Sequence, residues 1–128
     1  MKKFVVTLVL GTLAFAVCLG SAQARPPYAK EFGAKYVEGN KDTKFTEAVA
    51  AAKCNVCHDA KSKSKKDRNE YGKALSEHLS EADFKKLKDD AEALKKKIIE
   101  ALEKTEADKN AAEKTYGDLI KAGQLPGG

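Results

Sequence analysis

The sequence predicts a small all-α domain that follows a removable export signal. Apolar side chains in residues 25–128 recur at steps of three and four, which is the period of an amphipathic helix. No segment in this range alternates apolar and polar residues as a half-buried strand would. Polar capping residues and glycine-rich turns divide the range into short pieces. We therefore expect about four helices that share one small core.

Residues 1–24 have the layout of a secretory signal peptide. Two lysines near the start precede an apolar run, which closes on the small-residue pattern Ala22-Gln23-Ala24. The apolar run is shorter than the ~20 residues that a membrane-spanning helix needs, so an uncleaved anchor is the weaker alternative. The prediction is an exported protein, periplasmic or otherwise, in which residues 25–128 form a single domain. It would meet a membrane only through an uncleaved signal.

The domain is expected to begin with a leading segment and a first helix. Residues 25–42 start near two stiff prolines and end in a turn signal rich in glycine and asparagine. The first helix is expected to begin at Thr43 or Thr46, because either side chain can act as an N-cap. It should continue into a cysteine-containing motif at residues 53–58.

Three further helices follow from the spacing of apolar residues. A second helix fits residues 67–79 and carries one shared face: Tyr71, Ala74, Leu75 and His78. The longest helix is expected to open at the capping box that starts at Ser80. Its apolar stripe contains Phe84, Leu87, Ala91, Leu94, Ile98 and Leu102. The last, short helix carries Tyr116, Leu119 and Ile120.

The motif KCNVCH, residues 53–58, is the part of the sequence that points to chemistry. Outside the predicted signal, which contains Cys18, it holds every cysteine of the chain. Cys54, Cys57 and His58 would share one face of a helix. Two thiols at that spacing can add to the two vinyl groups of one haem edge, and the imidazole would then lie beneath the ring. C-x-x-C-H is the attachment signature of c-type haem, and covalent attachment suits an exported protein.

Three other uses of the motif fit the sequence less well. A thioredoxin-like dithiol would need a preceding strand, which the sequence does not predict. A structural zinc site would need four ligands, and the domain offers only two cysteines and two histidines. A disulfide between Cys54 and Cys57 would close too short a loop to stabilise the domain much.

The motif, placed after an Ala-rich helix and an export signal, resembles that of the small monohaem c-type cytochromes of bacteria. Residues 68–75, which follow it, resemble an exported bacterial subgroup with this domain. The resemblance implies a helical cytochrome c-like domain around one covalently attached haem c. It also implies that Cys54 and Cys57 form the thioether bonds and that His58 is the proximal iron ligand.

The second axial ligand departs from the familiar pattern of this family. Cytochromes c commonly use a methionine downstream of the motif, but the only methionine here is Met1. His78, the only other histidine, is the candidate distal ligand. An open or water-ligated iron, or ligation by a lysine or tyrosine, stays possible from the sequence.

These observations predict an electron carrier and not an enzyme. Nitrogen ligation by two histidines would give a lower reduction potential than methionine ligation. If the distal side is open, the alternative is a haem-based sensor of small ligands or a weak peroxidase. A haem-free helical interaction protein is a third possibility.

The distribution of charge suggests the partner. Residues 25–75 contain five more basic than acidic residues. Within this range, residues 61–66 form a loop made only of lysine and serine, the Lys/Ser loop. This loop predicts docking to an acidic redox partner protein, although a purely solvated loop gives the same composition. An exported chain is not expected to bind nucleic acid.

Overall fold

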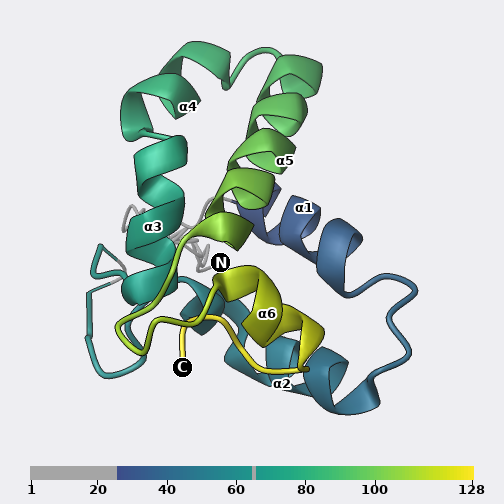
Figure 1. Cartoon of the computed structure of the whole chain (residues 1–128). Helices are drawn as coiled ribbons and strands as arrows, with labels where there is room; N and C mark the ends of the chain where they lie inside the picture. The colour runs from purple at the N-terminus through teal and green to yellow at the C-terminus, as the bar shows by residue number, and fades with distance from the viewer. Residues whose placement is uncertain (1–25, 65) are drawn as a thin grey trace, which may run out of the picture.

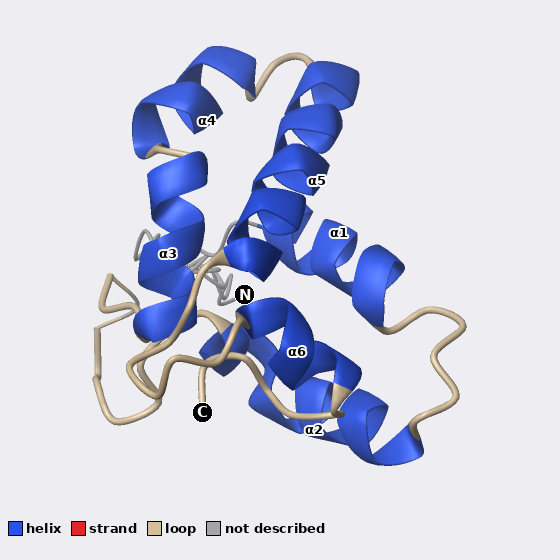
Figure 2. Ribbon diagram, viewed as in Figure 1, coloured by secondary structure: helices blue, strands red, loops and turns tan. Residues whose placement is uncertain are grey.

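The structure is a computed structural model that describes residues 26–64 and 66–128. Within these ranges it contains six α-helices, one 3₁₀ turn and no strand (Figures 1 and 2). The all-α prediction is therefore confirmed, although the expected number of helices, four, was too low. The predicted signal at residues 1–24 lies outside the described residues. None of the described helices combines the length and the apolar character needed to cross a bilayer.

The helices are short and follow each other closely along the chain. They are α1 (Pro26–Tyr36), α2 (Thr43–Ala52), η1 (Lys53–Val56), α3 (Glu70–His78), α4 (Glu81–Leu87), α5 (Ala91–Ala107) and α6 (Tyr116–Lys121). Helix α5 lies at the centre, because it packs against α1, α3, α4 and α6. Figure 1 shows α3 and α5 side by side, with α4 joining their upper ends and α2 below α6.

Helix α1 forms where only a leading segment was expected. Its two prolines occupy the first turn, where a missing backbone N–H costs nothing because that group has no intrahelical acceptor. Farther along, α1 buries Glu31 and Phe32 and packs on α5. The stiffness of the prolines was thus a helix-start signal and not a sign of irregular chain.

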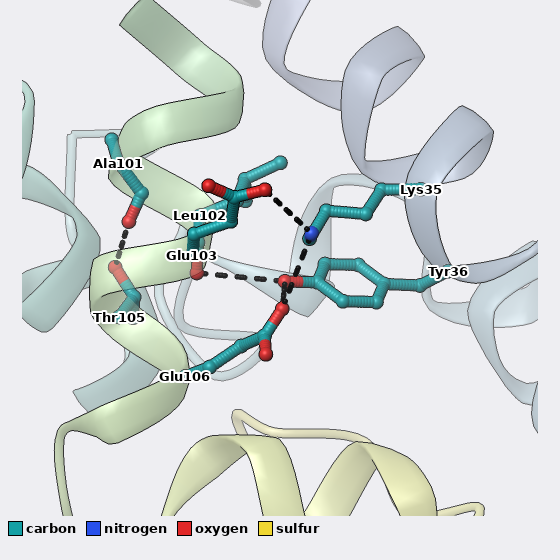
Figure 3. A network of polar contacts seen from close by, with 7 residues as sticks. All are labelled: Lys35, Tyr36, Ala101, Leu102, Glu103, Thr105 and Glu106. Carbon is teal, nitrogen blue, oxygen red and sulfur yellow. Dashed lines mark hydrogen bonds and ion pairs between the residues drawn. The ribbon is translucent and has the colours of Figure 1, made fainter.

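A polar network ties the end of α1 to α5 (Figure 3). The Tyr36 hydroxyl donates to Glu106 Oε1 at 2.7 Å. The Lys35 ammonium lies 3.3 Å from Glu103 Oε1 and 3.5 Å from Glu106 Oε1. Burial and the hydrogen bond to Glu106 raise the pKa of Tyr36 well above its usual range, so this phenol remains a donor.

The predicted longest helix is divided into α4 and α5. The capping box at Ser80 is present as predicted and starts α4. A second start follows a few residues later, where the Asp90 carboxylate accepts from the Ala93 backbone N–H at 3.0 Å. Because Asp90 offers this competing N-cap, the chain turns there and begins a new helix.

The apolar faces predicted from the sequence meet in one core. Tyr71 and Leu75 of α3 are buried, as are Leu94, Ile98 and Leu102 of α5. The three apolar residues predicted for the last helix are also buried: Tyr116, Leu119 and Ile120. Ala91, at the first position of α5, is exposed and does not belong to the core. Phe45 of α2 and Val56 of η1 are buried in the same cluster, which places the cysteine motif directly against the core.

Candidate functional site

The cysteine motif forms a 3₁₀ turn and does not continue the first helix. Helix α2 begins at Thr43, the earlier of the two predicted starts, although Asp42 and not a threonine is its N-cap, and it ends at Ala52. Lys53 then has φ 50° and ψ −117°, a conformation that departs from the α-helix and that non-glycine residues rarely adopt. The prediction that the helix runs through the motif was wrong, although the motif residues still share one turn.

The turn itself is closed by the Cys54 carbonyl. This oxygen accepts from the backbone N–H of Cys57 at 3.3 Å and of His58 at 3.0 Å. Both thiols are free, with Cys54 exposed and Cys57 partly buried. The pKa of the Cys57 thiol is raised to about 12. Burial is the main cause, and the nearby charge of Arg68 opposes it only in part. Cys57 is therefore a protonated thiol at neutral pH.

The imidazole of His58 is oriented by the far end of the basic loop. Its Nδ1 lies 3.3 Å from the carbonyl oxygen of Asp67, which also accepts from the Asp59 backbone N–H at 3.0 Å. Since a carbonyl oxygen can only accept, Nδ1 carries the proton and Nε2 of the neutral ring keeps its lone pair. Metal-binding histidines are commonly held in this way, with one nitrogen on a carbonyl and the other on the metal.

Asn69 joins the motif to the start of α3. Its Nδ2 donates to the carbonyls of Asn55 and Val56 at 3.1 and 3.0 Å. Its backbone N–H donates to the Cys57 carbonyl at 3.1 Å, and its Oδ1 accepts from the Gly72 N–H at 2.9 Å. From the sequence, Asn69 entered only as part of the stretch 68–75 that carries the resemblance. Its position three residues before Gly72, near the predicted helix start, is the signal that could have identified it as a cap.

Two glycines allow the backbone to pack closely around the motif. A Cβ atom on Gly72 would overlap the carbonyl oxygen of Cys57. A Cβ atom on Gly127 would overlap the Asn69 amide and lie 2.7 Å from the Val56 carbonyl oxygen. Helix α3 and the C-terminal tail therefore both rest against the motif. Neither glycine was assigned a role from the sequence.

Two buried polar atoms beside the motif have no hydrogen-bond partner among the described residues. They are Asn55 Oδ1, inside the motif, and the hydroxyl of Tyr71. Burial, together with nearby Cys57, raises the pKa of Tyr71 well above its usual range, so the phenol is protonated. Unpaired buried polar atoms are rare in folded proteins. Their position, the two free thiols and the orientation of His58 fit a group bound at the motif.

His78 lies away from the other three predicted site residues. It is the last residue of α3, and its Nε2 is 2.7 Å from Asp108 Oδ2. The motif contacts α3 at Gly72, in the first turn of that helix. His78 follows Gly72 by six residues, which is a rise of about 9 Å along α3 at 1.5 Å per residue. The structure thus brings Cys54, Cys57 and His58 together and gives His78 a different partner.

A zinc site at the motif gains no support from this geometry. In residues 26–64 and 66–128, no three His, Cys, Asp or Glu side chains are grouped so that they could hold a metal ion. Two surface clefts, of about 340 and 210 Å³, are lined by residues outside the motif.

The comparisons with known proteins return nothing. No protein-family model, curated protein or solved structure matches this chain.

Proposed function

We propose that this protein is an exported monohaem c-type cytochrome that carries single electrons between redox partners. The observation that carries the proposal is the contact between His58 Nδ1 and the Asp67 carbonyl. It leaves Nε2 of an imidazole available next to two free thiols on the same turn. This combination is what a covalently attached haem requires from the chain.

Three residues of the motif, together with Asp67, have distinct roles in the proposal. Cys54 and Cys57 would hold the haem through thioether bonds, and His58 Nε2 would bind its iron. The haem, when bound, supplies an iron that cycles between the ferrous and ferric states. Asp67 would keep the His58 ring oriented, because its carbonyl accepts a hydrogen bond from Nδ1–H.

The first test is whether the chain acquires haem at these cysteines. The full chain should be expressed in a host that exports proteins and attaches haem c, then analysed by intact mass and pyridine haemochrome. We expect one haem for each processed chain, complete loss in the Cys54→Ala/Cys57→Ala double variant and no loss in Cys18→Ala. Processed wild-type protein with the mass of bare peptide would contradict the proposal.

A second candidate function follows from the position of His78. The hydrogen bond to Asp108 holds this ring at the end of α3, so another side chain already engages its Nε2. An iron without a protein ligand on its distal side can bind small molecules, which favours a sensor of small ligands or a weak peroxidase.

The binding of CO separates these two functions. With His78 held by Asp108, we expect the reduced, haem-loaded protein to change its absorption spectrum when CO is added. We also expect His78→Gln to leave the spectrum of the CO-free protein as it is. A wild-type spectrum that CO does not alter, together with an altered His78→Gln spectrum, would instead identify His78 as the distal ligand and support the electron carrier.

The surface around the motif supports an acidic partner. Five lysines there are exposed, and Arg68 is partly exposed. None of these side chains forms an ion pair with another described residue: Lys53, Lys61, Lys63, Lys66, Arg68 and Lys73. By contrast, Lys35 and Lys104 are neutralised by glutamates of α5. Uncompensated positive charge near the motif would attract an acidic redox protein and orient it.

A further inference from the structure

We infer that Asn69 is the positioning residue of the motif, which fixes the turn that presents Cys57 and His58. This inference rests on the proposed function, because it concerns how the same turn would hold haem. Asn69 donates to the carbonyls of three consecutive residues, through its side-chain Nδ2 to the first two and through its backbone to the third. Those residues are Asn55, Val56 and Cys57.

The chemistry of the asparagine amide explains why this residue type suits the position. An asparagine Nδ2 has two hydrogens, and both are used on the motif, while Oδ1 remains free to cap α3. Aspartate could cap the helix but could not donate, and serine has a single hydrogen to donate. One side chain therefore couples the motif turn to the first turn of α3.

The surroundings of Asn69 leave it little freedom to move. Its side chain is part-buried, and Gly127 of the C-terminal tail packs directly against its amide. Two residues earlier, the Asp67 carbonyl accepts a hydrogen bond from Nδ1 of His58. The short segment 67–69 thus holds both the backbone of the motif and the ring of its histidine, so loosening Asn69 should disturb both.

The first measurement follows the exposure of Cys57 and needs no haem. Reduced chain prepared without haem attachment is treated with Ellman's reagent, and the exposed Cys54 provides the internal reference for fast labelling. Asn69→Ser keeps an N-cap oxygen but loses the paired donation, and we expect Cys57 to react at least about tenfold faster. Asp90→Ser makes a similar exchange at the N-cap of α5 and should not alter this rate.

The second measurement uses the haem-loaded protein. If Asn69 positions His58, then the midpoint potential of Asn69→Ser moves away from the wild-type value, and that of Asp90→Ser does not. The ratio of loaded to bare chain should also fall by about tenfold, as is typical when a group that orients a metal ligand is lost. A general loss of stability would lower the yield of Asn69→Ser but would leave the midpoint potential of its loaded chain at the wild-type value.

The outcomes separate the inference from the function on which it rests. Wild-type chain that never acquires haem refutes the proposed function, while the labelling rates still test the role of Asn69. Equal labelling of Cys57 in wild type and Asn69→Ser overturns the inference. If Asn69→Ser does not fold, Asn69→Asp replaces it, because aspartate is as good an N-cap as asparagine and lacks only the donation. Unchanged labelling in Asn69→Asp would overturn the inference equally.

Discussion

At the scale of single residues, close backbone contact around the motif depends on glycine. Gly72 lies in α3 with its Cα against the Cys57 carbonyl, whereas Gly33 lies in α1 with no atom within 4 Å of the position of its Cβ. The two positions therefore differ in what an added methyl group would meet, although both are helical.

Alanine substitution at these glycines should have opposite effects on stability. Gly72→Ala should destabilise the protein by about 1–3 kcal/mol, because the methyl group forces α3 away from the motif. Gly33→Ala should stabilise it by about 0.5–1 kcal/mol, since alanine favours the helix and meets no obstacle. Urea unfolding followed by circular dichroism measures both. Equal effects would mean that α3 does not pack on the motif as described.

Lys53 shows why the geometry of the motif could not be predicted residue by residue. A lysine with positive φ carries no sequence signal, because lysine prefers the helix that precedes it. Such strained residues persist where the surrounding structure holds them, and they are common at functional sites. Here the restraint comes from the Cys54 carbonyl and from Asn69, which bind the residues just after the strained position.

At the scale of helices, the sequence predicted the elements better than their ends. The three- and four-residue spacing identified α3, α5 and α6 and most of their buried side chains, because that spacing directly reflects which face meets the core. It joined α4 to α5, since both contribute to one apolar stripe while the chain turns at Asp90 for a local reason. Helix α1 was missed because its prolines were taken for an irregular segment.

The candidate site was predictable in part for a similar reason. Cys54, Cys57 and His58 are adjacent in sequence, so their proximity follows from local geometry. The contacts of Asn69 and Gly127 with the motif bridge 12 or more residues and depend on how α3 and the tail fold back. His78 was assigned from the inventory of ligands, and an inventory says nothing about the pairing with Asp108.

At the scale of the whole molecule, lysines differ in whether a carboxylate lies within ion-pair distance of them. Lys61, Lys63 and Lys66 of the Lys/Ser loop lack ionic partners among the described residues, whereas Lys97 and Lys104 of α5 share Glu100. A field from uncompensated charges can change association rates by ten- to a thousandfold, and salt screens it.

The effect of charge reversal on the rate of electron transfer should therefore depend on where the substitutions are made. For the reduced, haem-loaded protein, Lys63→Glu/Lys66→Glu should lower the rate of electron transfer to anionic ferricyanide by about tenfold at low ionic strength. The rate with cationic hexaammineruthenium(III) should rise instead. Lys95→Glu/Lys96→Glu changes the net charge equally on the exposed face of α5 and should have a much smaller effect.

Stopped-flow absorbance at several salt concentrations measures these rates. Addition of salt should make the rates of the variants converge, since screening removes long-range electrostatic effects. If both double variants respond alike, net charge and not its position governs the encounter, and the surface near the motif is not a docking site.

The pairing of Asp59 with Asp67 has a consequence for how such a protein could diversify. Because the Asp59 backbone N–H donates to the Asp67 carbonyl at the base of the loop, the exposed lysine side chains between them can be exchanged without removing the contact that orients His58. Variation at those lysines would alter the charge presented beside the motif, while the orientation of His58 stays constant. Natural or engineered variants could thus differ in the molecules they bind through a few substitutions in the Lys/Ser loop.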